Sequence, residues 1–258
     1  MNDGFELDAE SPIANRHWCL LLAVILLAGC AALPQPEISP VAVDVPADFP
    51  FSRYLQRPPG QVFSVDQSEL VIKTYRAGWL KGLAHSHVFT ASTLNGLIFL
   101  DPAGGASMAD LYFRPYDLVL DDPQARAAAG PEFESIRTES DVAATRLRML
   151  GPRLLDSNDH PFIRIHVAPG PAPGEVLLSI VLRSQTTTRL MPVEWSDSAE
   201  RLEVRARFRL THAELGLKPY SAFAGALAVA EPVDVMVALR ASVWNRATQS
   251  AQVRSGSS

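Results

Sequence analysis

The strongest constraint on the fold is a strict alternation of apolar and polar residues late in the chain. From Arg201 to Leu210 the sequence reads RLEVRARFRL, with an apolar residue at every second position, and Val233 to Ser242 repeats the alternation. Successive side chains of a strand point to opposite faces of its sheet, so each stretch predicts a strand with one apolar and one solvated face. Strands of this kind are typical of an antiparallel sheet.

The rest of the domain is also rich in strand patterns and poor in helices. Helices are predicted at 124–129, ended by Gly130-Pro131, and at 138–150, where Thr138 and Asp141 form a capping-box pattern. Further strands are predicted at 61–65 and 69–75 (a pair turning at Asp66-Gln67), 87–93, 94–100, 108–113, 118–120, 162–167, 175–183 and 187–194. Because two short helices cannot cover a parallel sheet on both faces, we predict an all-β fold: a closed or nearly closed antiparallel barrel of about eight strands.

The N-terminus carries the pattern of a targeting signal. Trp18 to Ala32 is an apolar run of about 15 residues, shorter than the ~20 needed to cross a bilayer. It contains Leu27-Ala28-Gly29-Cys30, which matches a bacterial lipobox, although acidic residues precede the run and a plain buried helix is the alternative interpretation. We therefore predict a signal peptide at 1–29 and lipidation of Cys30. Ala31 is not the aspartate linked with inner-membrane retention, so an outer-membrane lipoprotein facing the periplasm is expected.

Composition divides the remaining chain. Residues 30–60 are proline-rich and predict a lipidated N-terminus with a semi-extended tether, 61–244 a single β-barrel domain, and 245–258 a flexible tail. The two cysteines are Cys19 and Cys30. Cleavage before Cys30 would leave no free thiol for a disulfide, a redox centre or a nucleophile. Two or three acyl chains on Cys30 would anchor the protein stably to a membrane.

Several function classes find no support in the sequence. The formal net charge is -5, without the clustered basic face that nucleic acid requires, so no nucleic-acid partner is expected. The chain has no nucleophile elbow, HExxH, phosphate-binding glycine loop or CxxC. The carboxylates of Asp121-Asp122 lie beside Pro123, which is ordinary turn chemistry. We therefore expect no enzymatic activity.

Five motifs carry a family resemblance through their order and spacing. They are Phe63-Ser64-Val65-Asp66 with Ser68-Glu69-Leu70; Met149-Leu150 with Leu154-Leu155-Asp156; His160-Pro161-Phe162; Thr186-Thr187-Thr188-Arg189 with Pro192-Val193; and Leu215-Gly216-Leu217 with Pro219-Tyr220-Ser221 and Gly225-Ala226. From Phe63 to Ala241 the chain resembles the YceI-like family. That resemblance implies a lipocalin-like barrel that binds long isoprenoid lipids in the periplasm.

Within this family the chain is similar to a branch with an Arg-Ala-Gly…Gly-His-x-His segment. Here that segment is Arg76-Ala77-Gly78 followed by Ala84-His85-Ser86-His87, with Ala84 where a glycine is expected. A second departure is Ile163-Arg164-Ile165-His166, which replaces the usual Thr-Phe-Ser.

The apolar strand faces are the candidate ligand-binding residues. Each buried methylene contributes about 0.8 kcal/mol, so a hydrophobic tail needs no specific polar contact, and small or β-branched residues leave space for it. A filled core is the alternative. The candidate interior residues are Leu70, Ile72, Leu94, Ile98, Ile163, Ile165, Val204, Ala206, Phe208, Val235, Val237 and Leu239. The expected partner is a hydrophobic lipid, with no other cofactor, and the oligomeric state is left open.

The loop from Arg76 to His87 is predicted to lie at the mouth of the barrel. Trp79, Leu80 and Leu83 would form a lid over the mouth or pack under the loop. His85 and His87 point to the same side of a strand and could share a metal ion, with a third ligand from His160, His166, His212 or a carboxylate. The alternative function is therefore a metal-binding or redox-associated periplasmic protein, whereas in the simpler interpretation the pair braces the rim.

Overall fold

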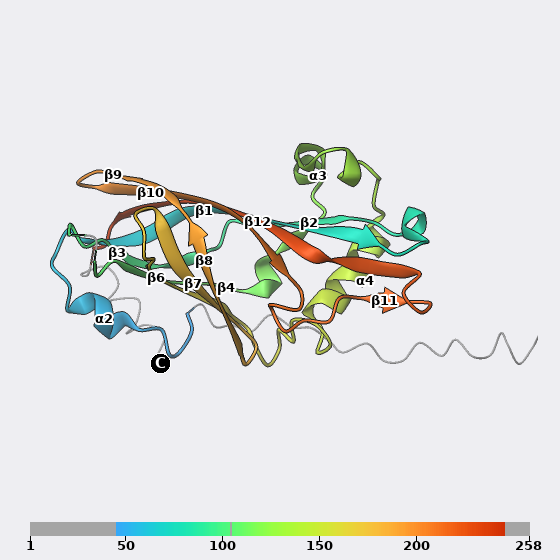
Figure 1. Cartoon of the computed structure of the whole chain (residues 1–258), viewed down its shortest axis with the longest axis horizontal. Coiled ribbons are helices and arrows are strands. Elements are labelled where there is room, and N and C mark those ends of the chain that lie inside the picture. The colour runs from blue at the N-terminus through green and yellow to red at the C-terminus, as the bar shows by residue number, and fades with distance from the viewer. Residues whose placement is uncertain (1–44, 104, 246–258) are drawn as a thin grey trace, which may run out of the picture. The chain divides into compact units, whose positions relative to one another are not determined.

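The computed structural model describes residues 45–103 and 105–245, which belong to one compact unit. The body of this unit is a twelve-stranded sheet whose neighbouring strands are all antiparallel (Figure 1). The strands are β1 (Val62–Ala77), β2 (His87–Ala91), β3 (Asn95–Phe99), β4 (Met108–Phe113), β5 (Val119–Leu120), β6 (Ile163–Pro169), β7 (Glu175–Leu182), β8 (Gln185–Pro192), β9 (Glu194–Asp197), β10 (Arg201–Thr211), β11 (Ser221–Ala222) and β12 (Leu227–Val243).

The helical elements are short. They are α2 (Phe51–Leu55), α3 (Pro123–Ala129) and α4 (Glu139–Leu150), with single 3-10 turns η1 (Lys81–Leu83), η2 (Pro115–Asp117) and η3 (Pro131–Phe133). The capping box predicted for α4 is confirmed, because the Thr138 hydroxyl accepts from the Asp141 N–H and the Asp141 carboxylate accepts from the Thr138 N–H.

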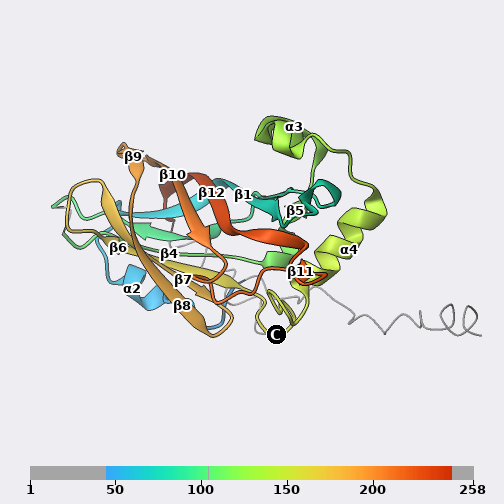
Figure 2. The same ribbon diagram turned by 45° about the vertical axis from the view of Figure 1, so that its right-hand side comes forward.

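The sheet curls into a half-barrel. Its hydrogen-bonded order is β8-β7-β6-β4-β3-β1-β12-β10-β9, while β2 and β5 branch from β1, and β11 lies beside β12. Figure 2 shows β6, β7 and β8 opposite β1, β10 and β12. Leu178 on β7 and Leu202 on β10, which are far apart in this order, belong to the same hydrophobic cluster. The predicted all-β class, an antiparallel barrel-type sheet with short helices, is confirmed.

One long strand replaces the predicted pair 61–65 and 69–75. β1 runs through Asp66-Gln67 without turning, and the register against β12 shifts between Val65 and Gln67. The Asp66 carboxylate accepts from the Ser242 N–H at 2.9 Å. A β-bulge thus accommodates two successive exposed polar residues that the sequence interpretation took for a turn.

Part of the predicted tether packs on the outside of the sheet. Residues 51–55 form α2, and Tyr54 is fully buried in a cluster with Val62, Leu97 and Phe99. The Tyr54 hydroxyl donates to Asp110 at 2.8 Å. From residue 45 on, the predicted tether is therefore not extended throughout, because its aromatic side chains bury apolar surface of the sheet. The predicted signal peptide lies outside the described residues, as does the predicted tail beyond residue 245.

A second outer cluster covers the half of β1 that pairs with β2. Phe133 of η3 packs with Val71 and Val88, and Ala125 and Ala129 of α3 pack against them. The excursion formed by α3 and η3 therefore lies on the outer face of the sheet, at the end where β1 stops.

Candidate functional site

The inner face of the sheet brings the predicted interior residues together. All of them belong to one hydrophobic cluster or pack directly against it. Leu70, Leu94, Ile98, Ile163 and Leu239 are buried members, and the others are partly buried. The pattern thus placed the apolar faces correctly.

The middle of β10 and β12 is accessible, although it faces inward. Ala206 pairs with Val237 and Phe208 with Val235, and these side chains are only partly buried. The same face is closed further along, where Leu202 and Leu210 are 1% and 2% exposed. The inner face therefore presents a bounded apolar stretch to solvent. Removing such surface from water yields roughly 25 cal/mol per Å², which favours an apolar ligand there.

The outer face of β10 is polar. Arg205, Arg207 and Arg209 are exposed, and the Arg209 Nε lies 2.5 Å from the Asp234 carboxylate across the pair. This face is a solvated surface, as the alternation predicted.

The mouth loop is held against the β11–β12 turn. The Leu80 N–H donates to the Ala226 carbonyl at 2.9 Å. Gly78 has a φ of +90°, and a Cβ placed on it would lie 2.3 Å from the same carbonyl oxygen. Trp79 is 79% exposed and Leu83 70%, so neither packs under the loop.

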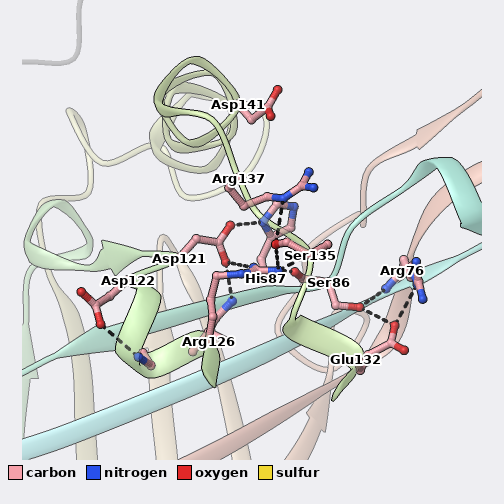
Figure 3. A network of polar contacts seen from close by, with 12 residues as sticks. Arg76, Ser86, His87, Asp121, Asp122, Arg126, Glu132, Ser135, Arg137 and Asp141 are labelled. Atoms are coloured by element: carbon pink, nitrogen blue, oxygen red, sulfur yellow. Dashed lines mark hydrogen bonds and ion pairs between the residues drawn. The ribbon is translucent and has the colours of Figure 1, made fainter. Parts of the chain in front are cut away.

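A buried ionic network lies beside this loop (Figure 3). Asp121, just after β5, has a fully buried carboxylate that His87 Nδ1 approaches to 2.6 Å and Arg126 Nη1 to 2.5 Å. The Val88 N–H also donates to it at 3.0 Å. Arg126, on α3, donates further to the carbonyls of Ser86 and Ser135. The network therefore ties the start of β2 to α3 and to the segment before α4.

A more exposed branch extends the network to β1. The buried Ser86 hydroxyl donates to Glu132 Oε1 at 2.8 Å and accepts from the Arg76 N–H at 3.2 Å. The Arg76 guanidinium donates to the same carboxylate at 2.9 Å. The Ser86 hydroxyl therefore bonds with Glu132 and with the Arg76 N–H. Figure 3 shows these two bonds apart from the His87–Asp121 contact.

The electrostatics keep Asp121 ionised. Burial alone would raise the pKa of this carboxyl, but hydrogen bonds from His87, the Val88 N–H and Arg126 outweigh it and hold the pKa below its ordinary value. A carboxylate only accepts hydrogen bonds, so the proton of the close contact resides on His87 Nδ1. The arrangement orients His87 and ties the start of β2 to α3.

His85 has a different environment. Burial, followed by the nearby charges of Arg137 and His87, lowers the pKa of His85. The histidines proposed as third ligands have partners of their own: His160 lies 3.9 Å from Asp156, His166 lies 2.8 Å from Asp110, and His212 Nδ1 lies 3.0 Å from the Glu231 carbonyl. Within residues 45–103 and 105–245, no three His, Cys, Asp or Glu side chains are grouped to hold a metal ion.

Sequence reasoning missed the acidic and basic members of the network. Asp122 caps a helix, accepting from the Gln124 and Ala125 N–H groups, and Asp121 lies at the bend before it with a φ of 56°, but the sequence did not indicate that Asp121 is also a buried ion-pair partner. The sequence contains one weak indication that Arg126 is buried. It is the charged residue of an alanine-rich helix, whose other side chains facing the sheet are small. Glu132 gave none.

Comparison with known proteins gives structural likeness only. No family model matches the chain, and no curated protein matches it in sequence. Similar solved structures include BcnA from Burkholderia cenocepacia, at 11% identity and a TM-score of 0.42, covering 67% of this chain and 95% of that one. A YceI protein from Campylobacter jejuni has 6% identity and a TM-score of 0.41, covering 59% and 82%.

One prediction and one finding concern the membrane. Cys30 lies outside the described residues, so its lipidation stays a prediction. Among the residues described, no helix has the length and apolar character to cross a bilayer.

Proposed function

We propose that this protein is an outer-membrane lipoprotein of the YceI-like type, which carries a long hydrophobic, isoprenoid-type lipid on the inner face of its half-barrel. One observation carries the proposal: inward-facing apolar side chains in the middle of β10 and β12 stay partly exposed, while the ends of the same face are buried. Acylated Cys30 would hold the domain at the membrane on its periplasmic side.

The chemistry of the face suits a lipid tail. The predicted interior residues are all apolar, so they offer no charge or hydrogen bond to a polar ligand. At about 0.8 kcal/mol per buried methylene, an isoprenoid chain would gain affinity from length alone. The exposed arginines of the outer face would keep the carrier in solution.

The mouth loop and its network have a supporting role. His87, Asp121 and Arg126 fix the position of the strand that follows the loop, so the end of the sheet is held in one arrangement. We propose a binding protein without catalysis, in which this network is structural.

Mass spectrometry of the full chain purified from bacterial membranes tests the proposal. Native spectra should show a bound species of several hundred daltons that leaves under denaturing conditions, and solvent extraction should return the same lipid. A polypeptide carrying nothing beyond the acyl chains on Cys30 would contradict the carrier. A mass raised only by a metal ion would favour the pair His85 and His87 instead.

A further inference from the structure

We propose that the end of the sheet bearing Trp79 docks on the surface of a bilayer that contains anionic phospholipid. Four exposed apolar side chains define this apolar tip: Trp79 (79% exposed), Leu83 (70%), Tyr220 (54%) and Phe223 (77%). The surface deepens the proposed function, because a carrier must exchange its lipid with a membrane.

The tip is built from two turns that are fixed to each other. Trp79 and Leu83 lie in the loop after β1, and Phe223 lies in the turn between β11 and β12. The Leu80 N–H bonds to Ala226, just past Phe223, and Gly78 packs against the same backbone. The backbones of the two turns are therefore held together at this end of the sheet.

The backbone holds Phe223 outward at a cost. Phe223 and Ala224 have φ values of 51° and 54°, a left-handed conformation that non-glycine residues rarely adopt. A hairpin turn of this shape ordinarily favours Asn-Gly, which would leave no aromatic group at its tip. The strained turn displays a large apolar ring to solvent, the arrangement expected where strain serves a contact.

Basic residues beside the apolar tip favour a membrane as its binding partner. Lys81 and Lys218 are exposed near the tip, and the guanidinium of Arg148 lies 5.5 Å from the ring centre of Tyr220. Aromatic rings with lysine or arginine beside them are the side chains that favour the membrane–water interface, and each basic residue near an anionic surface contributes about 1 kcal/mol. The whole chain has a net charge of -5, so attraction to anionic lipid would depend on these cations.

The length of the N-terminal segment is compatible with this contact. About 15 residues separate Cys30 from Val45, and a fully extended chain spans roughly 50 Å over that number. β1 covers 16 residues, also roughly 50 Å, between the end near α2 and the apolar tip. An anchored protein therefore has enough chain for the tip to meet the membrane that holds Cys30.

Tryptophan quenching in proteoliposomes tests the docking. The full chain is reconstituted in vesicles of phosphatidylethanolamine and phosphatidylglycerol that carry doxyl-labelled phosphatidylcholine, which quenches nearby tryptophan. Cleavage before Cys30 would remove Trp18 and leave Trp79, Trp195 and Trp244, and Trp195 on β9, 49% exposed, is the matched control. We expect Trp79→Phe to remove a large share of the quenchable fluorescence and Trp195→Phe to remove almost none.

Replacing phosphatidylglycerol with phosphatidylcholine should reduce the Trp79 share at least twofold, as should the double variant Lys81→Glu, Lys218→Glu. An equal quenchable fraction in wild type and Trp79→Phe would overturn the proposal. So would a Trp79 emission that shifts with protein concentration in the absence of vesicles, since the occupant would then be a second copy of the chain. Quenching measures contact with the membrane and not the amount of bound lipid. The experiment can therefore contradict the docking proposal without contradicting the lipid-carrier proposal, and the reverse.

Discussion

Asp121 and Arg126 form a buried ion pair in which Oδ1 and Nη1 are 2.5 Å apart, with side chains 0% and 7% exposed. They are five positions apart in sequence, and the chain turns from β5 into α3 between them. His87 completes the arrangement from β2, so three segments meet at one carboxylate. Removing one partner of such a pair leaves an uncompensated buried charge.

Asp121→Asn should therefore destabilise the protein by about 3–5 kcal/mol. The carboxamide keeps the shape but loses the negative charge that faces Arg126 and His87. Chemical denaturation, followed by circular dichroism, measures the change in the free energy of unfolding.

Glu203→Gln is the control for this prediction. Glu203 pairs with Arg240 at 3.1 Å on the exposed outer face, so its loss should cost no more than about 1 kcal/mol. Equal costs for the two variants would show that the buried network does not brace the rim.

Local sequence pattern was enough to predict strands such as β10, but not the network. The alternation of β10 follows from one face being buried and the other solvated, and it is visible within ten residues. The contact of Asp121 with His87 joins residues 34 positions apart, and neither residue type nor spacing indicates it. Such a pair depends on which strands become neighbours, which is decided by the whole sheet.

The prediction of an extended tether was wrong from residue 45 on for a related reason. Prolines predict an extended chain, but they do not indicate that the Tyr54 hydroxyl donates a hydrogen bond to Asp110 on β4. The bulge at Asp66 is a second case, because two successive polar residues suggest a turn equally well.

The proposed inner face can be tested by filling it. Ala206 is partly buried and faces inward on β10, so Ala206→Phe would place a ring where the lipid is proposed to lie. We expect the amount of co-purifying lipid to fall at least fivefold. The measurement is quantitative mass spectrometry of lipid extracted per mole of full-chain protein.

Ala238→Phe provides the matched control. Ala238 is also partly buried but lies on the outer face of β12, opposite Arg205 and Glu69. Its lipid content should match that of the wild type. A similar loss in both variants would indicate a general folding defect, and no loss in either would place the lipid elsewhere.

Stability should depend on pH through His85. Burial and the charges of Arg137 and His87 lower the pKa of His85 from its ordinary value of 6.5. Between the lowered pKa and 6.5 the unfolded chain binds more protons than the folded one, so stability rises with pH in that window. This contribution is complete above pH 6.5 and is lost as the pH falls through the folded-state pKa.

His85→Gln should therefore reduce the difference in unfolding free energy between pH 7.5 and pH 5. His160→Gln serves as the comparison, since His160 is also partly exposed and lies beside Asp156. Chemical denaturation at the two pH values gives the differences. An unchanged pH dependence in His85→Gln would mean that this histidine is as solvated when folded as when unfolded.

A substitution at Gly78 tests the contact between the mouth loop and the β11–β12 turn. Gly78→Ala would place a methyl group 2.3 Å from the Ala226 carbonyl oxygen, at a φ of +90° that disfavours any side chain. We expect a loss of at least ~1 kcal/mol of stability from the backbone conformation alone, with further loss from the clash. In Gly82→Ala the new methyl group meets nothing within 4 Å, so this control should change stability by about 0.5 kcal/mol or less. If the two alanine variants unfold at the same denaturant concentration, the loop and the turn are not held together at Gly78.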